Sequence, residues 1–242
     1  MHRLNAKPYL REIRLDRDNV AGFETYPFNI PAVRELRTLK FHPDVTFFSG
    51  ENGSGKSTLL EAIALAMGFS QEGGTRNMRG HSADTVSQLQ EFILPVRGVR
   101  QPRDFFFLRA ESFYNLATRS DEIGYLGGYG GKSLHARSHG EAFLAVLNHK
   151  LRGKGLYILD EPEAALSATS LMSALASIHR LVLDGSQFII ATHSPILLAY
   201  PRSKIVLFDD SGLSEVRYEE TDSFAITRRF VNDHKRAIEE LL

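Results

Sequence analysis

The chain has 242 residues, of which 43% are hydrophobic and 24% charged, proportions typical of a folded globular protein with a sizeable core. Its 29 basic residues balance its 29 acidic ones, so no overall field favours nucleic acid or a membrane surface. Cysteine is absent, which excludes disulfides and cysteine-bound zinc and is compatible with the cytoplasm, and no apolar run approaches the ~20 residues of a membrane helix.

The first fifty residues predict strands separated by turns. Residues 9–15 alternate loosely between apolar and polar side chains, and residues 36–41 form a second strand candidate. Residues 45–48 are β-branched or aromatic and predict a buried strand. The short link between the last two candidates indicates a meander.

The segment that follows, residues 50–58, reads GENGSGKST and fits the phosphate-binding pattern G-x-x-x-x-G-K-[ST]. It lies between a predicted strand and apolar residues at helical spacing, as the chemistry requires, whereas an ordinary glycine turn needs neither neighbour. Lys56 would reach the β- and γ-phosphates of a nucleotide, and the Ser57 hydroxyl would bind Mg²⁺. The residues predicted to bind the nucleotide here are Asn52, Gly53, Ser54, Gly55, Lys56, Ser57 and Thr58.

Residues 70–104 are the least regular part of the chain, and we interpret them as an insertion that packs on one edge of the nucleotide-binding domain. Their arginines have two interpretations. They contact the phosphates of a nucleic acid, or they belong to a solvated charged loop, which is the commoner case. These residues are Arg76, Arg79, Arg97, Arg100 and Arg103.

Residues 105–108, Phe-Phe-Phe-Leu, predict a central strand. Ligand-binding groups gather at the carboxyl ends of strands in open α/β sheets, which makes Glu111 a candidate site residue. Further on, Ser138 and Glu141 fit the capping box S-x-x-E at the start of a helical pattern. A compatible alternative is that Ser138 and the adjacent N–H groups form a second anion site.

Residues 156–159 predict an apolar strand that ends in Asp160 and Glu161. Two adjacent carboxylates are costly unless a cation or a polarised water lies beside them. Asp160 fits the acid that reaches Mg²⁺, and Glu161 fits the general base that deprotonates an attacking water. After a predicted helix over 171–182, a buried strand at 187–191 leads to His193, to which we assign a γ-phosphate contact.

The last forty residues predict a hairpin and a helix. Residues 205–208 and 214–218 form the hairpin, with the turn at 209–212. A final helix is expected over residues 223–241, with apolar residues at Phe224, Phe230, Ile238 and Leu241.

Together these motifs resemble the ABC-type P-loop ATPases, the nucleotide-binding domain shared by transporters and by chromosome-maintenance and DNA-repair head domains. GENGSGKST is similar to the Walker A motif, YILDEP to Walker B, and THSP to the switch-histidine loop. SHGE takes the place of the signature sequence, with Ser138 and Gly140 retaining the ends of its serine-glycine-glycine core. Residues 163–168 occupy the D-loop position without its aspartate, and Glu111 stands where the Q-loop glutamine is usual.

Within that family the chain most resembles the small stand-alone soluble ATPases labelled as AAA. The resemblance implies an α/β fold with a mixed central sheet, an antiparallel β subdomain and a helical subdomain. It implies one domain over residues 1–242. In that domain, residues 70–104 are an insertion, 112–152 the helical subdomain with the signature, and 203–242 a C-terminal hairpin and helix.

The resemblance also implies a mechanism with ATP and Mg²⁺ as the ligands. Two copies would face each other head to tail, each ATP lying on one copy's Walker A and beneath the other's Ser138 and Gly140. Glu161 would act as base, His193 would contact the γ-phosphate, and Ser57, Asp160 and Glu111 are the metal-site candidates. Opening and closing of this homodimer would drive a task on DNA or on a partner protein.

Three other functions stay open from the sequence: the ATPase subunit of a membrane transporter, a small-molecule kinase, and a nucleotide-binding regulator with little turnover. Transporter subunits usually carry LSGGQ and a Q-loop glutamine, and neither is present in the chain. Tyr26 and Phe28 are candidates for stacking on the adenine.

Overall fold

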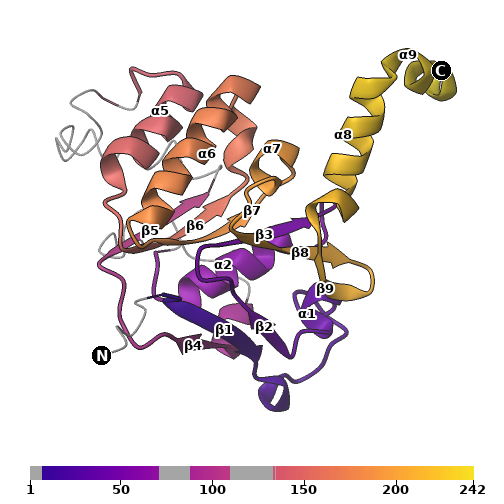
Figure 1. Cartoon of the computed structure of the whole chain (residues 1–242). Coiled ribbons are helices and arrows are strands. Elements are labelled where there is room, and N and C mark those ends of the chain that lie inside the picture. Colours follow the sequence, from indigo (N-terminus) through magenta and orange to yellow (C-terminus); the bar gives the residue numbers. More distant parts are fainter. Residues whose placement is uncertain (1–6, 71–87, 110–132, 134) are drawn as a thin grey trace.

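The computed structural model describes residues 7–70, 88–109, 133 and 135–242, which form two sheets with helices between and above them (Figure 1). The larger sheet has the strand order β5-β6-β7-β3-β8-β9. Its strands are β3 (Val45–Gly50), β5 (Asp104–Arg109), β6 (Gly155–Asp160), β7 (Gln187–Ala191), β8 (Ser203–Asp209) and β9 (Gly212–Val216). All neighbours are parallel except β8 and β9, which form the predicted hairpin.

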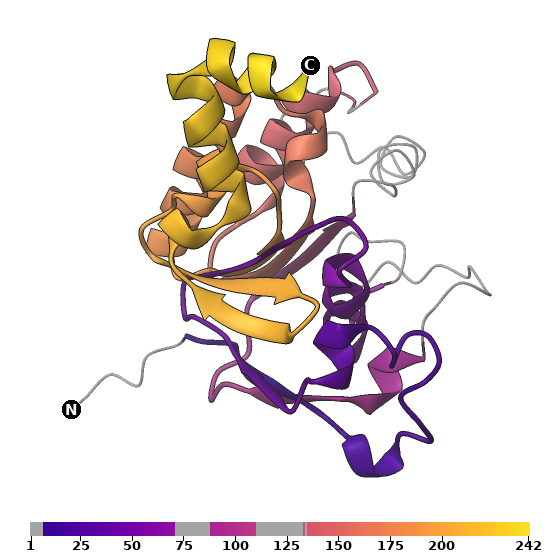
Figure 2. The same ribbon diagram turned by 90° about the vertical axis from the view of Figure 1, so that its right-hand side faces the viewer.

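The smaller sheet is antiparallel, with the order β2-β1-β4. It consists of β1 (Leu10–Leu15), β2 (Thr38–Lys40) and β4 (Ile93–Arg97). Helix α2 (Lys56–Ala66) lies between the two sheets, with α1 (Pro31–Arg34) and α3 (Leu89–Phe92) near it. Helices α5 (His139–Ala145), α6 (Ala168–Leu183) and α7 (Pro195–Leu198) cover the opposite face of the larger sheet (Figures 1 and 2).

The larger sheet is apolar on both faces because each face has its own core, as expected for buried parallel strands. In β6, Leu156 and Ile158 join the core shared with α2 and the smaller sheet, whereas Tyr157 and Leu159 join the core beneath α5 and α6. This alternation has the period of two that a strand imposes on its side chains. The predicted α/β fold, with a mixed sheet, an antiparallel β part and a helical layer, is confirmed.

Two expectations about connectivity were wrong. The strand candidates at 36–41 and 45–48 do not form a meander, since β2 and β3 belong to different sheets. Within the described residues, β5 is an edge strand that pairs only with β6. Phe106 and Phe107 are buried by packing on the two faces of the sheet rather than by two neighbouring strands: Phe107 contacts Phe69 in one core, and Phe106 belongs to the other.

The described part of segment 70–104 adds a strand to one edge of the smaller sheet. Residues 93–97 form β4, which pairs with β1 over the register Leu15 with Ile93 to Leu10 with Arg97. β4 therefore completes the antiparallel sheet, although it comes from a region that has the composition of a loop.

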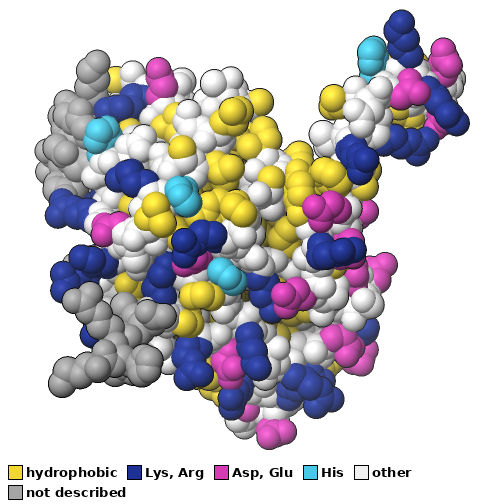
Figure 3. Space-filling model, viewed as in Figure 1, with side chains coloured by type: hydrophobic (Ala, Val, Ile, Leu, Met, Phe, Trp, Pro, Cys, Tyr) yellow, Lys and Arg dark blue, Asp and Glu magenta, His cyan; other side chains and the backbone are white. Residues whose placement is uncertain are grey.

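The C-terminal helix is divided into α8 (Asp222–Asn232) and α9 (His234–Leu241). Asp233 leaves helical geometry at φ −146° and ψ 63°, and its carboxylate accepts from the Arg236 N–H to cap α9. None of the residues in either helix is buried. Apolar side chains on the helical face of the molecule gather over α6 and α7 and at the base of α8 (Figure 3).

Candidate nucleotide site

Three loops meet at the carboxyl edge of the larger sheet. β6, β7 and β3 are parallel neighbours, with Asp160 paired to Ala191 and Phe48 paired to the same residue. The loops that follow these strands therefore emerge side by side. They carry the three predicted groups of site residues, and the glycine loop is about a hundred residues away in sequence from the loop after β6.

The glycine loop opens helix α2 without any side-chain cap. Gly55 is the N-cap at φ 97°, a left-handed conformation in which its missing side chain also gives room to Ile30, whose Cγ2 would lie 2.5 Å from a Cβ. The first N–H groups of an α-helix have no partner within the helix. Together with the helix dipole, the first turn of α2 is therefore suited to bind an anion.

Lys56 lies at the start of α2 and is only 4% exposed. Its Nζ donates to the carbonyl oxygens of Gly50 and Glu51, at 2.9 and 2.8 Å, so the ammonium lies inside the curl of the loop. Burial lowers the pKa of Lys56, while the negative charges of Glu161 and Asp160 act in the opposite direction. The positive charge is thus held beside two carboxylates and close to the backbone that would surround a phosphate.

Ser57 and Asp160 are brought together by the fold. The Ser57 Oγ donates to Asp160 Oδ1 at 3.0 Å, across 103 residues of sequence. Burial raises the pKa of Asp160 to about 6; the Ser57 hydrogen bond acts against this shift, and the charge of Glu161 adds to it. A hydroxyl and a carboxylate are oxygen donors of the kind that Mg²⁺ prefers, with phosphate oxygens and waters as its usual further ligands. The pair fits the predicted metal site.

Glu161 and His193 lie beside this pair. Glu161 has a left-handed backbone, with φ 45° and ψ 54°, which is costly for a residue with a side chain, and its N–H donates to the Ala191 carbonyl at 2.9 Å. Its Oε1 is 3.7 Å from His193 Nε2. The strained backbone thus directs the carboxylate toward the histidine.

Each of the three loops has a buried polar atom that lacks a hydrogen-bond partner among the described residues. These atoms are Ser54 Oγ, Glu163 Oε2 and His193 Nε2. An unsatisfied buried polar group costs about 1–3 kcal/mol, so a ligand that satisfies it is favoured. Because all three atoms lie at the carboxyl edge, this edge of the sheet fits a polar, charged ligand.

Ser138 is the N-cap of α5, as the capping box predicts. Its Oγ accepts from the Glu141 N–H at 3.3 Å, and Glu141 Oε2 accepts from the Ser138 N–H at 2.9 Å. Ser138 is exposed, and Gly140 lies in the first turn. In the described part of the chain no hydrogen bond or ion pair joins either residue to the glycine loop, so the second anion site remains a proposal.

Sequence reasoning missed the ion pair between Arg109 and Glu61. The Arg109 guanidinium donates to Glu61 Oε1 at 2.8 Å, and Arg109 pairs in register with Asp160. Glu61 lies one helical turn after Ser57, so the two side chains share a face of α2. The four-residue spacing between Ser57 and Glu61 was the signal in the sequence. It indicates a carboxylate beside the residues predicted to bind Mg²⁺.

The two adenine-stacking candidates differ in their surroundings. Tyr26 is 65% exposed, and its hydroxyl lies 3.4 Å from Thr58 Oγ1 at the glycine loop. Phe28 is buried, with edge-to-face contacts to Phe23 and Phe92, so that its ring belongs to the core and is not open to a base. The prediction for Phe28 was wrong because its aromatic side chain was taken as a candidate for stacking, whereas the fold places it in the core.

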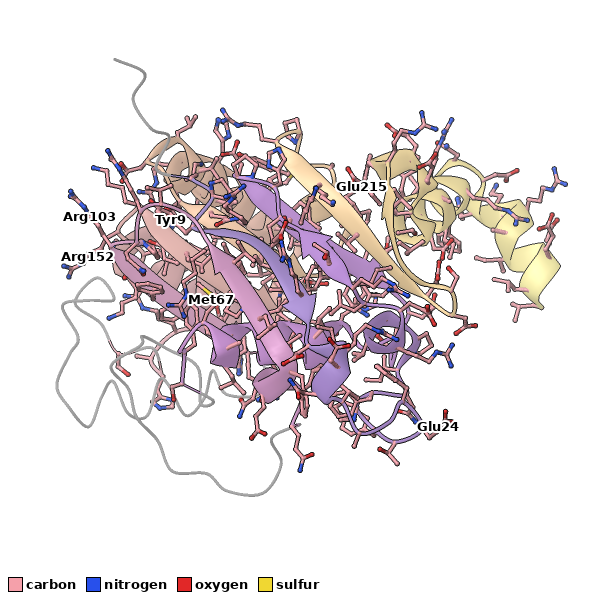
Figure 4. All side chains as sticks on the ribbon, turned by 90° about the horizontal axis from the view of Figure 1, so that it is seen from below. Tyr9, Glu24, Met67, Arg103, Arg152 and Glu215 are labelled. Carbon is pink, nitrogen blue, oxygen red and sulfur yellow. The ribbon has the colours of Figure 1, made fainter. Side chains whose placement is uncertain are left out.

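Arg103 contributes to a basic cavity on the other edge of the larger sheet. The cavity has a volume of about 400 Å³, and Arg103 and Arg152 lie close together beside it (Figure 4). Its remaining lining residues are Asp104, Lys150, Gly153, Lys154 and Asp184. It opens at the amino ends of β5 and β6, away from the glycine loop. The predicted site residue Glu111 and the arginines at 76 and 79 lie outside the described residues.

Comparisons with known proteins show which families the chain is similar to. A family model described as an AAA domain matches residues 20–103, less than half of the chain. The curated ABC transporter G family member STR2 from Medicago truncatula is 25% identical over 173 residues, which make up 62% of this chain and 24% of the relative. The chain thus corresponds to about a quarter of that protein.

Among solved structures, an ABC transporter of the metal-chelate type in an inward-facing conformation aligns over 91% of this chain and 88% of its own, with a TM-score of 0.50 and 16% identity. The SMC head domain from Thermotoga maritima aligns over 87% and 99%, with a TM-score of 0.45 and 17% identity. Among the described residues, no helix has the length and apolar character needed to span a membrane.

Proposed function

The chain has the fold of the ABC-type P-loop ATPases, and from this premise we propose that it binds ATP with Mg²⁺ and hydrolyses it to ADP and phosphate. The observation that carries the proposal is the meeting of the three loops. Lys56, the Ser57–Asp160 pair and the Glu161–His193 pair lie at one edge of the sheet. A lone glycine loop would support nucleotide binding only, whereas the adjacent base and histidine support hydrolysis.

The residues divide the work by their chemistry. The N–H groups of the loop and Lys56 bind the β- and γ-phosphate oxygens, and Mg²⁺, when bound at Ser57 and Asp160, neutralises charge on those oxygens. Glu161 orients a water and takes its proton as the water oxygen attacks the γ-phosphorus. His193 Nε2 donates to a γ-phosphate oxygen, and the bond from that phosphorus to the bridging oxygen of ADP breaks.

The removal of the Lys56 ammonium tests the binding step. We expect Lys56→Ala to weaken MgATP binding by at least about 100-fold, because truncating a buried charged contact costs several kcal/mol. Isothermal titration calorimetry measures the affinity, and circular dichroism confirms that the variant is folded. Lys235→Ala, on the exposed helix α9, is the matched control. Equal affinity in wild type and Lys56→Ala would refute the assignment of the loop.

The proposal includes a homodimer that forms with ATP. The γ-phosphate offers contacts to a second copy that ADP lacks, so ATP favours association and hydrolysis reverses it. In this dimer the exposed N-terminus of α5, with Ser138 and Gly140, would face the other copy's nucleotide. The task driven by this cycle acts on DNA or on a partner protein.

A substitution that places a large cationic side chain at the start of α5 tests the proposed dimer. Ser138→Arg adds charge and bulk where the opposing copy would dock, and we expect it to abolish the rise in mass on adding ATP. The measurement is light scattering in a Glu161→Gln background, which prolongs the ATP-bound state. Ser211→Arg, in the exposed turn between β8 and β9, is the control. An ATP-dependent mass shift that survives Ser138→Arg would exclude this face.

A second candidate function is the ATPase subunit of a membrane transporter, which is favoured by the transporters among the similar proteins. It predicts that the chain co-purifies with an integral membrane protein. The first proposal, a homodimer that acts on DNA or on a partner protein, predicts an ATP-dependent dimer that forms without any membrane protein.

A further inference from the structure

Glu163 lies just beyond the predicted base, in the short 3₁₀ turn Pro162–Ala165 that follows β6. The resemblance to the family places this residue at the start of the D-loop position but gives no role to its side chain. We infer that Glu163 is a positioning residue, whose carboxylate fixes the loop that carries His193. The inference rests on the proposed function for its catalytic consequence, but the contact itself can be tested without nucleotide.

The contact is between a side chain and the backbone of the neighbouring loop. Glu163 Oε1 accepts a hydrogen bond of 2.5 Å from the His193 N–H, across 30 residues of sequence. A hydrogen bond to an ionised carboxylate is roughly twice as strong as one between neutral groups. The carboxylate therefore determines the position of the His193 backbone, from which the imidazole projects.

The location of this hydrogen bond explains why a side chain is needed to join the two loops. β6 and β7 are joined by backbone hydrogen bonds up to the bond from Glu161 N–H to the Ala191 carbonyl. Among the described residues, no further backbone hydrogen bond joins the two loops beyond it. On the other side, the Thr192 N–H donates to the Phe48 carbonyl, and the Ser194 N–H donates to Thr192 Oγ1. The Glu163 carboxylate thus extends the link between the two strands past the end of the sheet.

The turn that carries Glu163 does not depend on its side chain. Backbone bonds from Ala164 N–H to the Glu161 carbonyl and from Leu166 N–H to the Glu163 carbonyl hold it. Removal of the carboxylate should therefore free the His193 loop while the base stays in place. Glutamine retains an oxygen acceptor in the same position and removes the charge, which separates the hydrogen bond from the electrostatics.

The first experiment is NMR of the nucleotide-free protein, with Glu163→Ala, Glu163→Gln and the exposed-site control Glu239→Ala. We expect the His193 amide proton of wild type to lie downfield and to exchange slowly. In Glu163→Ala it should move upfield and exchange at least about tenfold faster, while Glu163→Gln should keep most of the protection. An amide that is unchanged in Glu163→Ala would overturn the inference.

The second experiment is steady-state ATP hydrolysis by the same variants. A displacement of about 1 Å in a positioned group can cost 10²-fold in rate, so we expect kcat of Glu163→Ala to fall 10- to 100-fold with KM within threefold of wild type. Glu163→Gln should retain at least a third of kcat. Full activity in Glu163→Ala, or no recovery in Glu163→Gln, would contradict the positioning role. If wild type itself hydrolyses no ATP, the proposed function fails, and the amide measurement still decides the contact.

Discussion

Glu161→Gln will bind MgATP with an affinity within threefold of wild type and hydrolyse it about 10³-fold more slowly. The reason is that the amide has the size of the carboxylate and can still orient a water, but it cannot accept a proton. General bases contribute typically 10²- to 10⁴-fold to a rate. Release of phosphate at saturating ATP measures kcat, and calorimetry measures the affinity.

The same variant should accumulate as an ATP-bound dimer, because the step that dissolves the dimer is blocked. Light scattering with ATP, with ADP and without nucleotide measures this, and only ATP should raise the mass. Glu239→Gln on the exposed face of α9 provides the control for a change of one charge. Normal turnover in Glu161→Gln would remove Glu161 as the base, whatever the oligomeric state.

Asp160→Asn will stabilise the nucleotide-free protein while it abolishes Mg²⁺-dependent hydrolysis. Burial raises the pKa of Asp160 to about 6, from an ordinary value of 3.8. The folded protein therefore opposes ionisation of this carboxyl at neutral pH. A shift of about two pKa units corresponds to a cost on the order of 3 kcal/mol, which the uncharged asparagine avoids.

The direction in which the free energy of unfolding changes with pH follows from proton linkage. Between pH of about 4 and about 6 the folded state holds the Asp160 proton and the unfolded state has lost it, so the free energy of unfolding falls as pH rises through this range. Below pH of about 4 both states are protonated and the cost disappears. The advantage of Asp160→Asn should be full above pH of about 6 and small at pH of about 4.

Urea unfolding of wild type and Asp160→Asn at pH 7.5 and at pH 4, without nucleotide or Mg²⁺, measures this difference. Other titrating groups are common to both proteins and cancel in the comparison. Ser57 can still donate to the asparagine oxygen, so the hydrogen bond to residue 160 is retained. A variant that is less stable than wild type at pH 7.5 would show that Asp160 is not a buried acid held at the expense of stability.

The elements that carry the site were predictable because their signals are local. The strand at 45–48, the glycine loop and the first turn of α2 follow one another directly, so spacing alone places Lys56 and Ser57. Asp160, Glu161 and His193 each follow an apolar strand, and parallel strands bring their carboxyl ends to one edge. The roles of these residues, and the dimer, remain proposals.

The errors arose where an apolar or aromatic sequence pattern was taken as evidence for a central strand, for a stacking residue or for a single helix. Phe105 to Leu108 are apolar because layers cover them, a condition that an edge strand also meets. Phe28 follows a proline but packs between Phe23 and Phe92. Asp233 divides the C-terminal helix because its carboxylate caps the next one, which competes with continued helix.

The sequence by itself thus determined which residues could hold a phosphate and a metal, because loop curvature, helix dipole and side-chain chemistry act over a few neighbouring positions. Only the tertiary structure decided that β7 lies between β6 and β3, that Arg109 meets Glu61, and that Glu163 reaches the His193 backbone. Such contacts depend on strand order and on the lengths of side chains across a gap. Neither strand order nor the reach of a side chain across a gap produces a periodic pattern in the sequence.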